Sequence, residues 1–80
     1  MEKGLTFTYD RDGDILHIDL VQPYAEQESE ELGDDVIARL NPATGVIENL
    51  ELMFFSARLT QGELLAVPIS GEFRPLAAAG

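Results

Sequence analysis

The chain contains no cysteine, a single histidine and only five basic residues among its 80. The absence of cysteine excludes disulfide bonds, thiolate metal sites and a cysteine nucleophile, and it is typical of proteins in a reducing compartment. No apolar run is long enough to span a bilayer, and the start MEKGLTFTYD lacks the basic region and apolar core of a signal peptide. We therefore expect a cytoplasmic protein that does not enter a membrane.

Acidic residues are abundant, with 15 Asp and Glu that give a net charge of −10. This charge opposes binding to the phosphates of nucleic acids and favours basic protein partners. The 45% of hydrophobic residues is too high for a disordered acidic tail. A chain this short buries only about 60–65% of its unfolded surface, so its own core is small. We expect one β domain over residues 1–75, a frayed tail at 76–80, and self-association.

The stretch YDRDGDIL, residues 9–16, places aspartates at alternate positions beside a glycine. A calcium loop of the EF-hand kind that began at Asp10 would need glycine at its sixth position and glutamate at its twelfth. Those positions hold Ile15 and Val21. The residues therefore favour a turn over a calcium site.

Asp12 and Gly13 are typical of a two-residue hairpin turn in which the glycine takes a positive φ angle. On this interpretation Asp10→Asn and Asp14→Asn should change little. A hairpin closed there places apolar residues opposite apolar residues on one face, and His17 and Asp19 on the other. The predicted pairs are Arg11 with Asp14, Tyr9 with Leu16, Phe7 with Ile18, and Leu5 with Leu20.

A second hairpin is predicted around the turn NPATG, residues 41–45, because apolar residues alternate on both sides of it. They are Val36, Ala38 and Leu40 before the turn, and Leu50, Leu52 and Phe54 after it. Ile47 and Leu50 have opposite parity, so either a bulge lies between them or both faces are covered. The acidic segment 21–35 predicts a loop or an irregular strand.

Ser56 and Gly62 are typical of the N-cap and the C-terminal stop of a short helix over residues 57–61. Alternating apolar residues from Leu65 to Phe73 predict a final strand, whose Pro68 suits a sheet edge. The fold class is therefore mainly β, α+β at most: a small antiparallel meander of about five strands built from two hairpins, with one short helical turn.

The order YDRDGDILHIDL, ESEELGDDVIARLN and TGVIENLELMFFSARL resembles a family of small prokaryotic proteins catalogued as domain of unknown function 2283. The resemblance covers residues 8–59 and is carried mostly by structural motifs. It implies the β fold but no catalytic residue. Some relatives are encoded beside small basic toxin-like proteins, so the resemblance also implies an antitoxin-like or partner-binding role.

Few residues are candidates for chemistry. His17 and Asp19 point the same way on one strand, as a base and its orienting partner would, but a half-exposed histidine on a sheet face is the simpler interpretation. No nucleophile motif, phosphate cradle or dinucleotide fingerprint is present. We therefore predict no catalytic residue, cofactor or metal ligand. The alternative is a small acidic metal-dependent enzyme or binder that uses His17, Asp19 and the acids of residues 26–35.

We favour a non-catalytic, self-associating interaction protein with a basic protein partner. Its predicted partner-binding residues lie in EQESEELGDD and are Glu26, Glu28, Glu30, Glu31, Asp34 and Asp35. The same acids could also serve only as a solvated segment that keeps the protein soluble. A homodimer is expected to cover either the final strand or the apolar residues of opposite parity, which are Ile15, Ile37, Met53 and Phe55.

Overall fold

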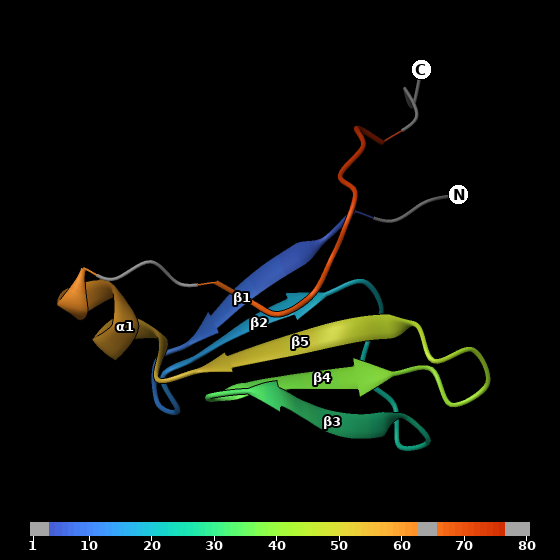
Figure 1. The fold of residues 1–80 in the computed structure, drawn as a ribbon, viewed down its shortest axis with the longest axis horizontal. Helices are drawn as coiled ribbons and strands as arrows, with labels where there is room; N and C mark the ends of the chain where they lie inside the picture. The colour runs from blue at the N-terminus through green and yellow to red at the C-terminus, as the bar shows by residue number, and fades with distance from the viewer. Residues whose placement is uncertain (1–3, 63–65, 77–80) are drawn as a thin grey trace.

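The computed structural model describes residues 4–62 and 66–76, which form five strands and one helix. They are β1 (Thr6–Asp10), β2 (Ile15–Asp19), β3 (Glu28–Gly33), β4 (Val36–Leu40), β5 (Ile47–Met53) and α1 (Phe55–Gln61). The strands make one antiparallel sheet in the order β1-β2-β5-β4-β3, so β1 and β3 are its two edges (Figure 1). This confirms the predicted mainly β class with five antiparallel strands and one short helix, but the order is not that of a simple meander, because β2 neighbours β5 and not β3.

The first hairpin has the predicted register but not the predicted turn. Tyr9 pairs with Leu16, as expected, and the last pair joins Asp10 to Ile15, so residues 11–14 all belong to the loop. The positive φ angle, 55°, falls on Asp14. The predicted positive φ at Gly13 and the pairing of residue 11 with residue 14 are therefore wrong. The Asp10 carboxylate holds this longer loop by accepting hydrogen bonds from the backbone N–H groups of residues 12 and 13.

The second hairpin contains a β-bulge, which settles the two alternatives left by the sequence. Ala38 pairs with Leu50, but Leu40 pairs with Ile47, and the register shifts between them. The extra residue on β5 brings Ile47 back to the face that carries Leu50. The alternation does not continue to Phe54, because that residue leaves the strand with a φ angle of 55° and is 53% exposed.

Part of the acidic segment 21–35 forms a strand with one irregularity. Residues 28–33 form β3, which pairs with β4 and has one register shift near its end. Of the two predicted structures, the irregular strand is correct for these residues and a loop is correct for residues 21–27. Several glutamates are tolerated in this strand because it lies at the sheet edge, where their side chains stay exposed.

The helix begins two residues earlier than predicted and lacks a side-chain cap of its own. Its N-cap residue is Phe54, so Ser56 lies within the helix and the predicted N-cap is wrong. The C-terminal stop at Gly62 is confirmed, since its φ angle is 68° and its N–H donates to the carbonyl of Leu59. No helix in the described part of the chain is long and apolar enough to cross a bilayer.

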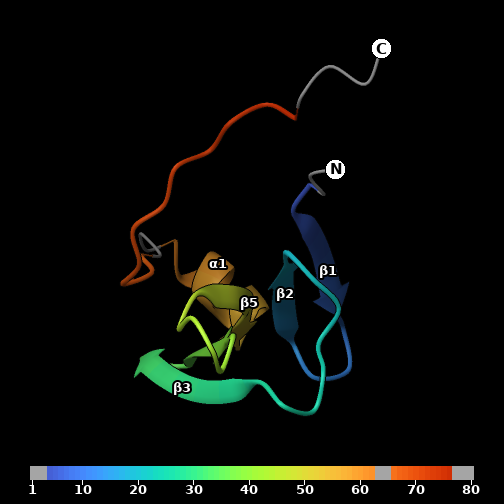
Figure 2. The same cartoon turned by 90° about the vertical axis from the view of Figure 1, so that its right-hand side faces the viewer.

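The core occupies one face of the sheet, called here the apolar face. Four side chains are buried in it, those of Val36, Ala38, Leu50 and Leu52. Residues 66–76 cross this face without forming a strand (Figure 2). The Val67 side chain of this segment packs against the core. The predicted final strand is therefore wrong for residues 66–73, while Leu65 and the predicted tail beyond Leu76 lie outside the described residues.

Candidate functional site

All six predicted partner-binding acids lie along one edge of the sheet and are exposed. This acidic edge consists of Glu26 before β3, Glu28, Glu30 and Glu31 within it, and Asp34 and Asp35 in the turn that follows it. Glu30 pairs with the buried Ala38 and so extends from the apolar face, whereas Glu31 pairs with Ile37 and extends from the opposite face. The described sheet has no strand on the outer side of β3. Carboxylates therefore lie on both faces of the sheet, beside the backbone edge of β3 that has no strand partner in the described sheet.

The start of the acidic edge is held in place by Asn49, whose side chain is buried on the polar face, opposite the apolar face. The Asn49 amide donates hydrogen bonds to an Asp19 carboxylate oxygen at 2.8 Å and to the Val21 carbonyl at 2.6 Å. Its own oxygen accepts a hydrogen bond from Gln27 at 2.7 Å. Because Gln27 immediately precedes β3, this network ties the loop of residues 20–27 to β5, the central strand of the sheet.

A second anchor of the same loop joins Tyr24 to Glu48 at the β-bulge. The Tyr24 hydroxyl donates to a Glu48 carboxylate oxygen at 2.6 Å, and Gln27 donates to the same oxygen at 3.1 Å. The hydrogen bond to Glu48 raises the pKa of Tyr24 from 10.0 to about 12. The hydrogen bonds from Tyr24, Gln27 and Asn41 lower the pKa of Glu48. The sequence flags the bulge through its change of parity but does not reveal these partners.

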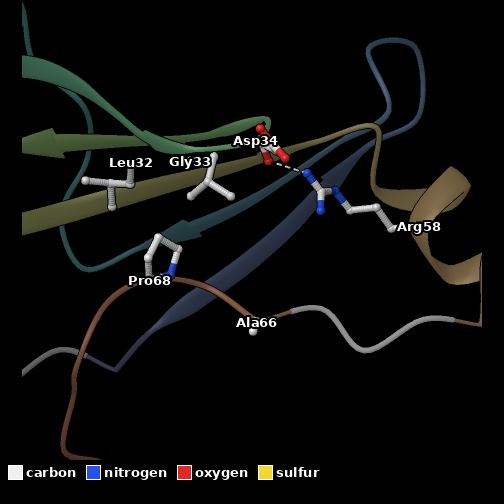
Figure 3. A pocket seen from close by; sticks show the side chains of 7 residues that line it. Leu32, Gly33, Asp34, Arg58, Ala66 and Pro68 are labelled. Atoms are coloured by element: carbon white, nitrogen blue, oxygen red, sulfur yellow. Dashed lines mark hydrogen bonds between the residues drawn. The ribbon is translucent and has the colours of Figure 1, made fainter.

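The other end of the acidic edge contacts α1 through Arg58. Its guanidinium lies 3.6 Å from the Asp35 carboxylate and also donates to the carbonyls of Asp34 and Met53. Arg58 lines an open hollow of about 420 Å³ between the β3–β4 turn and the C-terminal segment (Figure 3). The guanidinium is thus bound by the chain's own backbone and offsets part of the charge at Asp35.

Asp14 binds the start of α1 from the tip of the first hairpin, 42 residues away in the sequence. One carboxylate oxygen accepts from the Tyr9 hydroxyl at 2.6 Å and from the Ser56 N–H at 2.9 Å, and the other accepts from the Ser56 hydroxyl at 2.9 Å. The hydrogen bonds from Tyr9 and then Ser56 lower the pKa of Asp14. In turn, the hydrogen bond to Asp14 raises the pKa of Tyr9. Asp14 therefore supplies the side-chain cap that α1 itself lacks, a role that no local sequence pattern indicates.

His17 and Asp19 lie on the polar face of β2, as predicted, but the structure does not place them with the acids of β3. His17 pairs in register with Thr8 and Glu51, and the Asp19 carboxylate is bound by Asn49. β5 and β4 separate β2 from β3. Within residues 4–62 and 66–76, no three His, Cys, Asp or Glu side chains are grouped so that they could hold a metal ion.

The comparisons with known proteins give one match. The family model described as "Protein of unknown function (DUF2283)" matches residues 6–56, which include all five strands of the described sheet. This match confirms the resemblance drawn from the sequence. No curated protein and no solved structure matches the chain.

Proposed function

Because the chain belongs to the DUF2283 family of proteins of unknown function, we propose a role from its surfaces: a non-catalytic interaction module that binds a basic protein along its acidic edge. A basic toxin-like protein would be one such partner and would make the chain antitoxin-like. The observation that carries the proposal is the position of six exposed acids around one open strand edge.

The geometry of β3 suits the addition of a strand from a partner. An extended segment can hydrogen-bond to the open backbone edge, while its side chains alternate between the two faces of the enlarged sheet. Lysine or arginine side chains on one side of that segment reach Glu28 and Glu30, and those on the other side reach Glu31. Charge complementarity would also accelerate the encounter.

A purely protective role for the same acids is the main competing explanation. Charges on an edge strand prevent two copies of that edge from pairing. This effect and partner binding are compatible, because the carboxylates of β3 repel a second copy of β3 and attract a basic segment. The two explanations differ in whether the acids increase the affinity for a basic strand.

The test uses a labelled peptide of repeated Lys-Lys-Val-Val, which places lysines on both faces of an extended strand, and measures binding by fluorescence anisotropy. The variant Glu30→Lys/Glu31→Lys changes the acidic edge, and Asp12→Lys/Glu72→Lys is the matched control, since both variants raise the net charge from −10 to −6. The control residues are exposed and lie in the first hairpin turn and the C-terminal segment. We expect the edge variant to bind at least tenfold more weakly than the wild type, and the control to bind much better than the edge variant.

The salt dependence gives a second criterion. Binding should weaken steeply with added salt, since exposed charges are screened beyond about 8–10 Å at physiological ionic strength. Equal losses of affinity in the two variants would show that only net charge matters. That result, or a wild type that does not bind the peptide, would support the protective role alone.

A further inference from the structure

The opposite edge of the sheet carries no charge over most of its length. Residues 4–9, GLTFTY, include the first four residues of β1 and contain neither an acid nor a base. Phe7 is 61% exposed, Tyr9 42% and Leu5 38%, although all three share the face on which the core lies. An uncharged edge strand with exposed aromatic residues lacks the usual protection against pairing with another strand.

The protein also exposes more surface than a compact monomer of its size. Its accessible area is 6212 Å², whereas a folded monomer of 8.8 kDa exposes about 4800 Å². The extended C-terminal segment accounts for part of the excess. The difference, about 1400 Å², exceeds the roughly 800 Å² that each partner buries in a standard interface. This excess belongs to the chain as a whole, and at β1 the exposed apolar surface is that of Phe7, Tyr9 and Leu5.

We propose that two copies associate through β1, which pairs antiparallel with β1 of the second copy about a twofold axis at Phe7. The two five-stranded sheets then form one continuous sheet, and their apolar faces become adjacent. This inference is independent of the proposed function, which concerns the other edge.

The sequence of β1 is self-complementary in this arrangement. Phe7 faces Phe7 of the second copy, and Leu5 faces Tyr9, so apolar side chains meet on the apolar face. Thr6 faces Thr8 on the other side of the sheet. No two like charges face each other among these pairs, and aromatic cross-strand pairs are among those that stabilise sheets.

Six of the 15 acids, those of the acidic edge, lie at the far edges of this dimer, and Asp10 at the end of β1 faces Gly4, so it meets no like charge. Nine strand spacings of about 4.8 Å separate the two copies of β3, which gives about 43 Å. This separation is several times the screening length of about 8 Å at physiological ionic strength. The C-terminal segment also leaves the middle of β1 open: Leu76 lies close to Gly4, before the strand begins, and Phe7 remains exposed.

The test introduces a charged residue at the twofold axis, either acidic or basic. Phe7→Glu and Phe7→Lys are prepared separately, and each brings two like charges together in the proposed dimer. We expect light scattering at micromolar concentration to give the mass of two chains for the wild type and of one chain for each variant. An equimolar mixture of the two variants should recover the mass of two chains, because glutamate then faces lysine. Phe73→Glu, which changes an 85% exposed residue of the C-terminal segment, should remain dimeric.

A cross-linking experiment checks the register independently of the charge variants. The chain has no cysteine, so Phe7→Cys introduces a single thiol that should form an interchain disulfide much faster than Val46→Cys, which lies in an exposed turn. A wild-type mass of one chain would overturn the proposal. So would a dimer that survives both charged substitutions, or equal cross-linking rates for the two cysteines.

Discussion

The two edge strands of the sheet expose the same kind of backbone surface but differ in the charge of their side chains. β1 and β3 each present unpaired backbone groups on their outer sides. β3 and its flanks carry six acids, whereas residues 4–9 carry no charge. Charges on an edge exclude an identical edge and admit an oppositely charged one, so β3 suits a different protein while β1 suits a second copy.

The two proposals together give a dimer with an acidic edge at each end. Such a dimer could engage two basic segments at once, and a partner with two segments would bind more tightly by avidity than either contact allows alone. The comparison of the edges can be tested by changing each of them and the contacts that hold them.

The largest effect should come from removing the charges of β3. The variant Glu28→Gln/Glu30→Gln/Glu31→Gln keeps the size of the side chains but leaves an uncharged, exposed strand edge. Because edge charges oppose strand pairing between molecules, we expect this variant to aggregate at pH 7 at concentrations where the wild type stays soluble. Turbidity and light scattering measure the difference.

A matched control separates the position of the charges from their number. Asp10→Asn/Asp12→Asn/Glu72→Gln also raises the net charge from −10 to −7, but leaves the acidic edge intact. This control should stay soluble. If both variants aggregate to the same extent, net charge rather than edge charge protects the protein.

Asn49→Ala should produce the largest loss of stability among the anchoring residues. Asn49 is only 2% exposed, and the substitution removes its hydrogen bonds with the Asp19 carboxylate, the Val21 carbonyl and Gln27, although Gln27 keeps its bond to Glu48. Unsatisfied buried polar groups cost about 1–3 kcal/mol each in unfolding free energy, so we expect a loss within that range. Urea denaturation measures the loss. Hydrogen exchange should increase more in β3 than in β1, and equal increases at both edges would show that Asn49 does not specifically hold the acidic edge.

The register of the first hairpin could be predicted because it depends on local information. The alternation of apolar residues on both sides of the turn admits the pairing of Tyr9 with Leu16, whatever the turn type. The predicted two-residue turn is wrong, because the sequence Asp12-Gly13 is typical of such a turn but the Asp10 side chain stabilises a longer loop. Gly13 needs no positive φ there, although an added Cβ would lie 3.0 Å from an Asp10 carboxylate oxygen.

The elements and contacts that the sequence left undetermined depend on residues far apart in the chain. β3 has an acidic composition that alone favours a loop, and it becomes a strand because β4 offers a partner and the edge keeps its side chains in solvent. The acids of the candidate site were identified from sequence, but their arrangement along one edge was not. The contacts of Asn49 and Asp14 span about 30 and 42 residues, and no local pattern signals them.

Asp14→Asn should weaken the attachment of α1 to the β1–β2 hairpin in a pH-dependent way. Asparagine tolerates the left-handed backbone conformation at this position, so the substitution mainly removes the charge and one acceptor. The pKa of Asp14 is lowered in the folded state, so its carboxylate stabilises the fold above its ordinary value of 3.8, and this contribution is lost as the pH falls through the lower folded value. We expect a lower Tm at neutral pH and a difference from the wild type that shrinks in acid.

Asp10→Asn is the control for this experiment. Its side-chain oxygen can still accept from the backbone N–H groups of residues 12 and 13, so its Tm should stay close to that of the wild type. An Asp14→Asn variant with the same Tm as Asp10→Asn at neutral pH would show that the cap contributes little. Thermal denaturation followed by circular dichroism over a range of pH gives both comparisons.

Tyr24→Phe should have the smallest effect, because the Tyr24 side chain is partly exposed and Gln27 and Asn41 continue to bind Glu48. In the wild type the pKa of Tyr24 is raised from 10.0 to about 12, so its contribution to stability is complete below pH 10 and is lost as the pH rises through about 12. The phenylalanine variant should be slightly less stable at neutral pH and should lose less stability over that alkaline range.

The pKa of Glu48, followed by NMR in the Tyr24→Phe variant, should rise, since the hydrogen bond from Tyr24 is the main cause that lowers it. Tyr9→Phe should instead raise the pKa of Asp14 and leave Glu48 unchanged, because the two tyrosines serve opposite edges of the sheet. A Glu48 that titrates identically in the wild type and in Tyr24→Phe would remove Tyr24 from the set of contacts that hold the acidic edge.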